Sequence, residues 1–142
     1  MIRKGAYVLI FDMPETQIKV GALGIVDIRE GTYCYVGSAM NGLDQRIGRH
    51  LSKKKKVHWH IDHLTTVCGR IEAYEAAAPG TTECELGKIV LDKGGSGYAA
   101  GFGCSDCKCP THLFFLTENS KEKICSSHVL IPYSKQSASA LR

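Results

Sequence analysis

Side chains that could together hydrolyse a phosphodiester are spread along this sequence at intervals that suggest one site. They are two tyrosines that border apolar runs, a basic pair that follows the second run, and a later glutamate: Tyr7, Tyr35, Arg46, His50 and Glu83. Hydrolysis needs a base to activate water, a cation to neutralise the phosphate and a carboxylate to hold a metal ion. The set supplies all three functions, although none of its members is informative alone.

Strands that could carry the two tyrosines are predicted from runs of apolar residues. Residues 5–12 have the pattern of a buried strand, and residues 32–37 have it again. Between them, residues 17–28 alternate apolar and polar side chains around two glycines, which is typical of a short hairpin at a sheet edge. Residues 70–74 and 112–116 also have strand character.

Helices are predicted for the segment that carries Arg46 and His50 and for the segment that carries Glu83. Leu43, Ile47 and Leu51 recur every four residues, which is the spacing of one helix face. A second helix is predicted over residues 83–91, with Thr82 as its N-cap. The basic side chains occupy a neighbouring stripe of the first helix, at Arg46, Arg49 and His50.

These elements predict an α+β fold, a small mixed or antiparallel sheet flanked by helices, with an inserted hairpin. The 142 residues fit one domain, which we place at 1–118, and the polar segment 119–142 is expected to be a partly flexible C-terminal extension. No apolar run approaches the ~20 residues that span a bilayer, and there is no signal-peptide pattern. We therefore expect a soluble, cytoplasmic protein without a membrane partner, and we favour a monomer.

The net charge of +4 is a mild excess, with 18 lysines and arginines against 14 acidic residues. Its distribution is more informative, because residues 46–56 contain six basic side chains and no acid. A local patch of this kind attracts polyanions, although a solvated helix end would have the same composition. The candidates for contact with nucleic acid are Arg49, Lys53, Lys54, Lys55, Lys56, His58 and His60.

The chain contains seven cysteines, and a reducing compartment argues against a disulfide framework. Cys34, Cys68 and Cys84 stand in apolar surroundings and are expected to be small core residues. Thiolates and imidazole at short spacing in the sequence are soft ligands suited to zinc, which makes the later cysteines a candidate zinc site. The alternatives for these cysteines are that they are reduced and structural, or that they have a redox role. The candidate zinc ligands form the pattern Cys-x-x-Cys-x-Cys-x-x-His, at Cys104, Cys107, Cys109 and His112.

Two short motifs, and the helix that follows the second, resemble those of the GIY-YIG nuclease superfamily. Residues 5–7, Gly-Ala-Tyr, stand where that family has its first motif, and residues 35–37, Tyr-Val-Gly, stand where it has the second. Arg46 and His50 then resemble its arginine helix. More closely, the chain resembles the DUF123 branch, a domain of unknown function, over roughly residues 4–116. The matching segments are 35–39, 46–51, 58–62, 83–86 and 101–107.

The chain departs from the superfamily pattern in two places. Tyr7 and Tyr35 lie further apart than in typical members, which the predicted hairpin at 17–28 explains as an insertion. The tyrosines would still occupy adjacent strands, although the insertion could reshape or cover the cleft. Ala6 replaces the isoleucine of the first motif, which removes apolar volume without affecting the chemistry.

The resemblance implies a role for each residue of the set. Tyr7 is the candidate base and Tyr35 its partner in positioning water, provided that nearby positive charge stabilises a phenolate. His50 is the alternative base, because an imidazole titrates close to neutral pH. Arg46 is expected to hold the scissile phosphate, since a guanidinium offers a planar fork of donors.

Glu83 is expected to bind a single divalent cation, magnesium or manganese, through oxygen. Its competitor is Glu85, two residues further along the same helix. Glu83 shares a helix face with Leu86 and Val90 that points toward the sheet, whereas Glu85 aligns with Ile89. The pattern therefore favours Glu83, although a glutamate in the first turn also suits the helix dipole without any metal.

A metal-dependent endonuclease that hydrolyses phosphodiester bonds in DNA, selective for structure or damage, is the function that we expect. RNA stays an alternative substrate. Two other functions remain open, namely a catalytically weak nucleic-acid-binding module of the same fold and a zinc-stabilised interaction domain. Variants of Arg46 and Glu83 separate the first two, because both should lose cleavage while the fold is largely spared.

Overall fold

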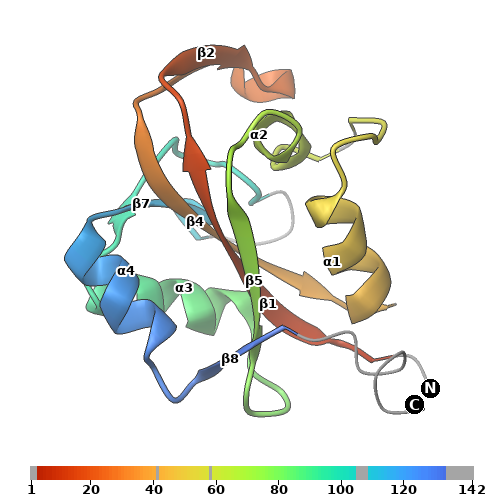
Figure 1. Ribbon diagram of the computed structural model, residues 1–142, viewed down its shortest axis with the longest axis vertical. Coiled ribbons are helices and arrows are strands. Elements are labelled where there is room, and N and C mark those ends of the chain that lie inside the picture. Colours follow the sequence, from red (N-terminus) through yellow and green to blue (C-terminus); the bar gives the residue numbers. More distant parts are fainter. Residues whose placement is uncertain (1–2, 41, 58, 105–108, 134–142) are drawn as a thin grey trace.

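A six-stranded antiparallel sheet forms the centre of the structure, a computed structural model that describes residues 3–40, 42–57, 59–104 and 109–133 (Figure 1). The strand order is β6-β7-β4-β1-β5-β8, and each pair of neighbours is antiparallel. The predicted α+β class is therefore confirmed. The bounds are Gly5–Met13 for β1, Gly31–Ala39 for β4, Ile71–Ala76 for β5, Ser96–Gly97 for β6, Leu113–Leu116 for β7 and Leu130–Pro132 for β8.

Strand β1 is buried on both faces, which explains why its sequence is a continuous apolar run. Successive side chains of a strand point to opposite faces of the sheet. Tyr7, Leu9 and Phe11 accordingly belong to one cluster of buried side chains, and Val8 and Ile10 belong to a second. Both faces of the sheet therefore need a cover.

Two helices pack on each face of the sheet, which gives three layers (Figure 1). Helices α1 (Leu43–Leu51) and α2 (Asp62–Thr65) lie on the Tyr7 side, and their buried side chains join the first cluster. Helices α3 (Glu83–Asp92) and α4 (Glu118–Cys125) cover the other side and contribute to the second cluster. Within the described ranges, every helix is too short or too polar to cross a membrane.

The predicted hairpin is confirmed as a separate two-stranded sheet between β1 and β4. It consists of β2 (Thr16–Lys19) and β3 (Ile25–Ile28), joined by the short 3-10 helix η1 (Gly21–Leu23). Gly24 follows that helix with a φ of 79°, a region that favours glycine. Despite the insertion, β1 and β4 pair along their whole length.

The polar segment after residue 118 takes part in the fold. Helix α4 starts after Thr117, which forms a capping box with Ser120, and β8 pairs with β5. Ile124 and Leu130 are buried in the same cluster as the side chains of α3. The core thus continues through both elements, whereas residues 134–142, the end of the expected extension, lie outside the described residues.

The buried face of α1 differs from the predicted one by a single residue. Leu43 and Ile47 are buried as expected, but Leu51 is 39% exposed, and His50 is buried instead at 1%. Positions i, i+4 and i+7 lie on one helix face, so Leu43, Ile47 and His50 form a continuous stripe. The helix therefore brings a polar ring into the core.

Candidate active site

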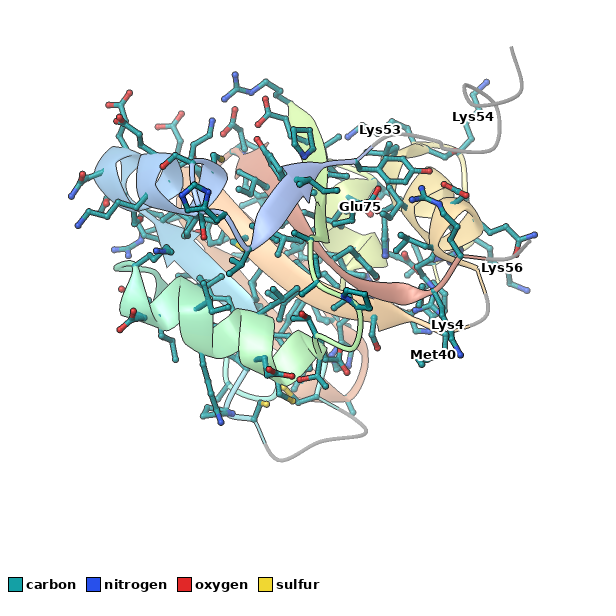
Figure 2. All side chains as sticks on the ribbon, turned by 90° about the horizontal axis from the view of Figure 1, so that it is seen from below. Lys4, Met40, Lys53, Lys54, Lys56 and Glu75 are labelled. Atoms are coloured by element: carbon teal, nitrogen blue, oxygen red, sulfur yellow. The ribbon has the colours of Figure 1, made fainter. Side chains whose placement is uncertain are left out.

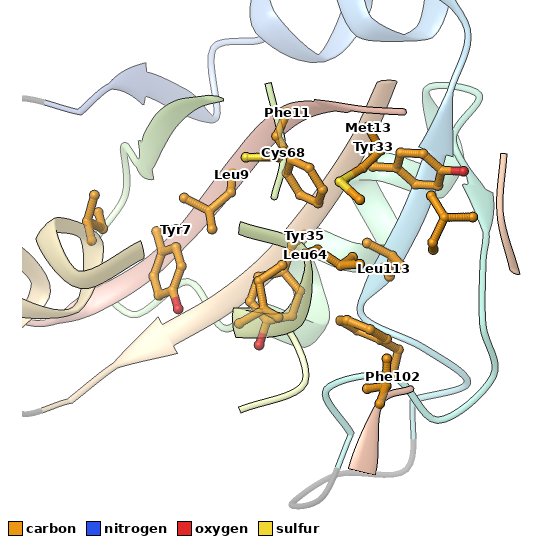
Figure 3. Close-up of a cluster of buried hydrophobic side chains, with 14 of the residues drawn as sticks. Tyr7, Leu9, Phe11, Met13, Tyr33, Tyr35, Leu64, Cys68, Phe102 and Leu113 are labelled. Atoms are coloured by element: carbon orange, nitrogen blue, oxygen red, sulfur yellow. The ribbon is translucent and has the colours of Figure 1, made fainter. Parts of the chain in front are cut away.

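Tyr7 on β1 and Tyr35 on β4 lie on adjacent strands, as predicted, and on the same face of the sheet. Tyr7 pairs with Gly37 and Tyr35 pairs with Leu9, which makes the two tyrosines diagonal neighbours. Figure 3 shows both rings in the buried cluster, with their hydroxyl groups directed the same way. Gly37 leaves the necessary room, because a Cβ at this position would lie 2.6 Å from the Tyr7 hydroxyl oxygen.

His50 forms a hydrogen bond with Tyr7 inside the protein, and 2.7 Å separate the Tyr7 hydroxyl oxygen from the His50 Nε2. Burial, with a smaller effect from the charge of Lys55, lowers the pKa of His50 to about 3. Burial also raises the pKa of Tyr7 well above its ordinary range. At neutral pH the phenol is therefore protonated and the imidazole is uncharged, so the hydroxyl donates and Nε2 accepts.

The second ring nitrogen of His50 is buried as well. Because Nε2 accepts from Tyr7, the proton of the neutral imidazole is on Nδ1. Among the residues that the structure describes, this nitrogen has no hydrogen-bond partner. A buried donor without a partner is uncommon in protein cores and usually has a functional or structural reason.

Arg46 reaches the Tyr7 hydroxyl from α1, one helical turn before His50. Its charge and its hydrogen bond lower the pKa of Tyr7, but burial has the larger, opposite effect. The guanidinium also donates from Nη1 to the backbone oxygen of Ser38 at 3.0 Å, and its Cζ lies 4.3 Å from the centroid of the Trp59 ring. The Arg46 side chain is half-buried. Positive charge is present as the sequence interpretation requires, yet it does not produce a phenolate.

The two candidate glutamates of α3 have different partners. Glu85 forms a capping box with Thr82, in which its carboxylate accepts from the Thr82 backbone N–H at 3.1 Å. Glu83 instead lies with Oε2 3.6 Å from the Nδ1 of His112. After burial, the charge of Glu83 is among the causes that raise the pKa of Tyr7 and of Tyr35. The negative charge of Glu83 therefore acts on both tyrosines, whereas Glu85 caps the helix.

Two of the lysines expected to contact nucleic acid bind the protein itself. Lys55 donates from Nζ to the backbone oxygen of His50 at 3.0 Å and to the hydroxyl of Thr65 at 2.6 Å. Lys53 donates to the backbone oxygens of Thr65 and Cys68. These ammonium groups satisfy carbonyl groups near the ends of α1 and α2, which have no partner within their own helices. Their charges therefore stabilise the loop between the two helices.

Arg49 is also bound by the protein itself, through the carboxylate of Asp62. Asp62, whose side chain is fully buried, accepts from Arg49 Nη1 at 2.8 Å and from Nη2 at 2.7 Å. The same carboxylate accepts from the backbone N–H of Trp59 at 2.8 Å, and the Arg49 Cζ lies 4.3 Å from the Trp59 ring centroid. Asp62 therefore fixes the tryptophan against which Arg46 packs. Its place in segment 58–62 is the only sequence signal for this role.

The remaining basic candidates differ in their surroundings. Lys54 and Lys56 are exposed, and Figure 2 shows them on the α1 side of the molecule, away from α3. His60 is half-buried and accepts at Nδ1 from the backbone N–H of Gly103 at 3.0 Å, so it fixes a loop. His58 lies outside the described residues. The basic surface is thus smaller than the charge count of the segment indicates.

A second group of ligand-type side chains lies at the N-terminal end of α3. Cys84, Cys109 and His112 each present a ligand atom within 4.8 Å of the others. The expectation that Cys84 is a core residue is wrong, since it is half-exposed and its Sγ lies 2.9 Å from the Sγ of Cys109. Among the described residues, Cys104 is not part of this group, and its Sγ donates to the backbone oxygen of Phe102. Cys107 lies outside the described residues.

The sequence spacing could not assign Cys84 to this cluster. Twenty-five positions separate it from Cys109, so the fold rather than a local motif brings the two thiols together. Its position directly after Glu83, in the first turn of a predicted helix, was the only signal. Cys34 and Cys68 are buried, as predicted.

Comparison with known proteins places the chain in a family. The family model described as domain of unknown function DUF123 matches residues 6–133, which include α4 and β8. No curated protein and no solved structure matches the sequence. The matched region contains the tyrosines, the basic helix, Glu83 and the cysteine cluster. The chain therefore belongs to the DUF123 family.

Proposed function

We propose that this chain is an endonuclease that hydrolyses phosphodiester bonds in DNA with the help of one divalent cation. The observation that carries the proposal is the hydrogen bond between Tyr7 and His50, with Arg46 and Glu83 acting on the same hydroxyl group. Buried polar groups lose their hydration, so apolar side chains would fill this space at a lower cost in free energy. These are also the residues through which the sequence resembles the GIY-YIG nucleases.

Tyr7 and His50 together accept the proton in this proposal. A water molecule beside the phosphate donates a hydrogen bond to the Tyr7 oxygen, whose own proton is directed at Nε2 of His50. As the water attacks phosphorus and the P–O bond to the leaving oxygen breaks, the proton of the water passes to the Tyr7 oxygen and the Tyr7 proton passes to His50, while the leaving oxygen takes a proton from solvent. The pair gains one proton in total, and no phenolate forms. This route does not need a lowered pKa of Tyr7.

The bound phosphate assists this transfer. The low pKa of His50, about 3, makes the imidazole a weak base while the site holds no anion. A phosphate bound at Arg46 brings negative charge close to the pair. Because negative charge stabilises an imidazolium, it raises the pKa of His50 when substrate is present. The base is thus strongest when it is needed.

Arg46 and a cation held by Glu83 would neutralise the negative charge of the substrate. A guanidinium has several N–H donors, so the bond to Ser38 leaves others for phosphate oxygens. The Glu83 carboxylate adds negative charge next to the tyrosines and offers the oxygen ligand that magnesium and manganese prefer. A cation held there by Glu83 would neutralise charge on the phosphate and on the leaving oxygen.

A nucleic-acid-binding module without efficient chemistry is the second candidate, and burial favours it. Tyr7 and His50 are each only 1% exposed, so a substrate reaches the pair only after side chains such as Arg46 move. Under this reading the tyrosine–histidine pair is structural, while Arg46, Lys54 and Lys56 hold the phosphates. The two candidates share their charge arguments and differ in chemistry.

Cleavage assays on end-labelled DNA separate the two candidates. Duplex, branched and single-stranded DNA, with a matched RNA, are incubated with the purified chain and magnesium or manganese. We expect cleavage of DNA, and a loss of about 10²–10⁴-fold in rate for Tyr7→Phe and Glu83→Gln with unchanged circular dichroism.

Glu85→Gln is the matched control for Glu83→Gln, because glutamine also completes a capping box and full activity should remain. If the wild-type chain retards DNA in a gel but cuts none of the substrates, the binding module is the correct reading. If Glu83→Gln cuts as fast as the wild type, Glu83 does not hold a catalytic cation.

A further inference from the structure

We infer that Cys84, Cys109 and His112 form a binding site for a soft divalent metal ion, zinc foremost, where α3 meets segment 109–112. Two thiols and one imidazole converge here from parts of the chain that are distant in sequence, with their ligand atoms within 4.8 Å of one another. This inference goes beyond the proposed nuclease function and does not depend on it.

The chemistry of the donor set selects the ion. Thiolate sulfur and imidazole nitrogen are soft ligands that favour zinc, whereas magnesium and manganese prefer carboxylate and water oxygens. An ion held by Cys84, Cys109 and His112 is therefore of a different kind from the one proposed at Glu83. The chain would carry two chemically distinct metal sites side by side.

The distances fit a tetrahedral ion after a small adjustment. Zinc lies about 2.3 Å from sulfur and about 2.0 Å from nitrogen, so its ligand atoms are roughly 3.5–3.8 Å apart. The sulfur atoms of Cys84 and Cys109 are 2.9 Å apart, and the largest separation in the group does not exceed 4.8 Å. Side-chain rotations that move these atoms by about 1 Å therefore bring all three to the required positions.

The segment that carries Cys109 and His112 is held in place by its backbone. The carbonyl of Pro110 accepts from the N–H of Gly101 at 2.7 Å. His112 donates its N–H to the carbonyl of Phe102 at 2.9 Å, and its own carbonyl accepts from β4 at 3.1 Å. These bonds fix the two ligands relative to the sheet before any ion binds. Such preorganisation is what a metal site needs.

Helix α3 holds the third ligand with similar firmness. Cys84 lies in the first turn of α3, which the capping box between Thr82 and Glu85 fixes at its start. Leu86, two residues later, is buried in the core under the helix. The three ligands thus project from two rigid elements that the ion would connect.

An ion can reach the site from solvent. A cavity of about 470 Å³ is bordered by the three ligands, together with Lys88, Leu91 and Phe114. Cys84 and Cys109 are half-exposed at its wall, while His112 is buried behind them. The cavity also leaves space for a water molecule as fourth ligand, as tetrahedral zinc with three protein ligands commonly has.

The position of this site gives it a consequence for Glu83. The carboxylate of Glu83 lies 3.6 Å from the Nδ1 of His112, and Glu83 directly precedes Cys84. An ion that ties Cys84 to segment 109–112 would therefore restrict the first turn of α3 and the carboxylate that it carries. The metal would act as a structural element that positions Glu83.

Metal content and metal affinity test the inference directly. The full chain is purified under reducing conditions without a chelator, and its zinc is measured by mass spectrometry and by competition with a chromophoric chelator. We expect one zinc per chain. Loss of a supporting residue around a metal typically costs 10–100-fold in affinity, so Cys84→Ser and Cys109→Ser, which each remove a ligand, should cost more than about 100-fold.

Cys125→Ser is the matched control, since Cys125 is also half-exposed but lies on α4 and outside the cluster. Its zinc content and affinity should equal those of the wild type. Cobalt substitution gives a second readout, because the thiolate-to-metal absorption should weaken in the Cys84 and Cys109 variants and persist in the control. Circular dichroism shows that the compared variants are folded.

Three outcomes would overturn the inference. The first is a wild-type chain that binds no zinc in the competition titration. The second is a Cys84→Ser variant with wild-type zinc affinity, which would place the ligands elsewhere. The third is a disulfide between Cys84 and Cys109 in the purified protein, together with a failure to bind zinc after that disulfide is reduced. A zinc-loaded chain that fails to cut DNA would contradict the nuclease proposal but would not contradict this inference.

Discussion

His50, Arg46 and Glu83 each act differently on the Tyr7 hydroxyl. His50 accepts its proton, Arg46 favours its ionisation, and Glu83 opposes it. The sequence indicated all four residues but treated Tyr7 and His50 as competing bases. Their hydrogen bond could not be predicted, because the helical pattern placed Leu51 rather than His50 on the buried face of α1.

The buried His50 should make the stability of the protein depend on pH. The pKa of His50 is about 3 in the folded chain, against 6.5 for an ordinary histidine. Between these values the unfolded state binds more protons, so the stabilising contribution is complete above about pH 6.5 and is lost as the pH falls toward 3. We expect the free energy of unfolding to fall by up to about 1.4 kcal/mol per pH unit in this window.

Urea unfolding of the wild type and of His50→Gln across this pH window measures the effect. The His50 variant should have the flatter profile, because its side chain does not titrate. His128→Gln is the control, since His128 is exposed, and it should keep the wild-type slope. Equal slopes in all three proteins would contradict a buried neutral His50.

At the scale of elements, the loop between α1 and α2 shows why composition alone misleads. Four consecutive lysines predict a surface for polyanions, but Lys53 and Lys55 donate to backbone carbonyls of the two helices. Sequence patterns report how many charges a segment has, and only the fold determines which carbonyl groups lie within reach. Strands β1 to β5, strand β7 and the helices α1 and α3 were predictable, because their apolar patterns are strong.

Asp62 should matter more for stability than an exposed acid does. Asp62→Asn removes the negative charge that pairs with Arg49. The same carboxylate accepts a hydrogen bond from the backbone N–H of Trp59. Breaking a buried ion pair costs about 3–5 kcal/mol, and we expect about 2–3 kcal/mol here because Arg49 is partly exposed. Chemical denaturation with urea at neutral pH measures the loss.

Asp12→Asn is the control for that substitution. Asp12 and Arg70 form a surface ion pair, with 44% and 60% of their side chains exposed. Exposed pairs of this type contribute about 0–1 kcal/mol, so the control should stay close to the wild type. Similar losses in both variants would show that Asp62 does not hold the loop.

On the scale of the whole molecule, the described residues up to 133 bury apolar side chains on both faces of the sheet, and α4 and β8 complete the core on the α3 side. Helix α4 and strand β8 escaped prediction because each places a single large apolar side chain in that core, Ile124 and Leu130 respectively. One buried residue in a polar segment gives no period to detect. The three-layer arrangement nevertheless depends on both elements to cover the sheet on the α3 side.

A chain that ends at Thr117 should fail to fold cooperatively. The truncation removes two buried side chains and the edge strand, and losses of about 2–5 kcal/mol for each buried residue approach the usual total stability of about 5–15 kcal/mol. Near-ultraviolet circular dichroism and thermal melts report the outcome. A chain of residues 1–133, which keeps the family-matched region, is the control and should melt as the full chain does. A sharp transition in the shorter chain would make residues 118–133 dispensable.

The hairpin of β2 and β3 has a consequence for how distant relatives of this chain can be found. It joins β1 and β4 at the end where Met13 pairs with Gly31, so its length can change without altering which residues of the two strands face each other. The number of residues between the two tyrosines is therefore free to drift during evolution. A search that scores strand pairing, with Tyr7 opposite Gly37, should recover homologues that a fixed interval between motifs excludes.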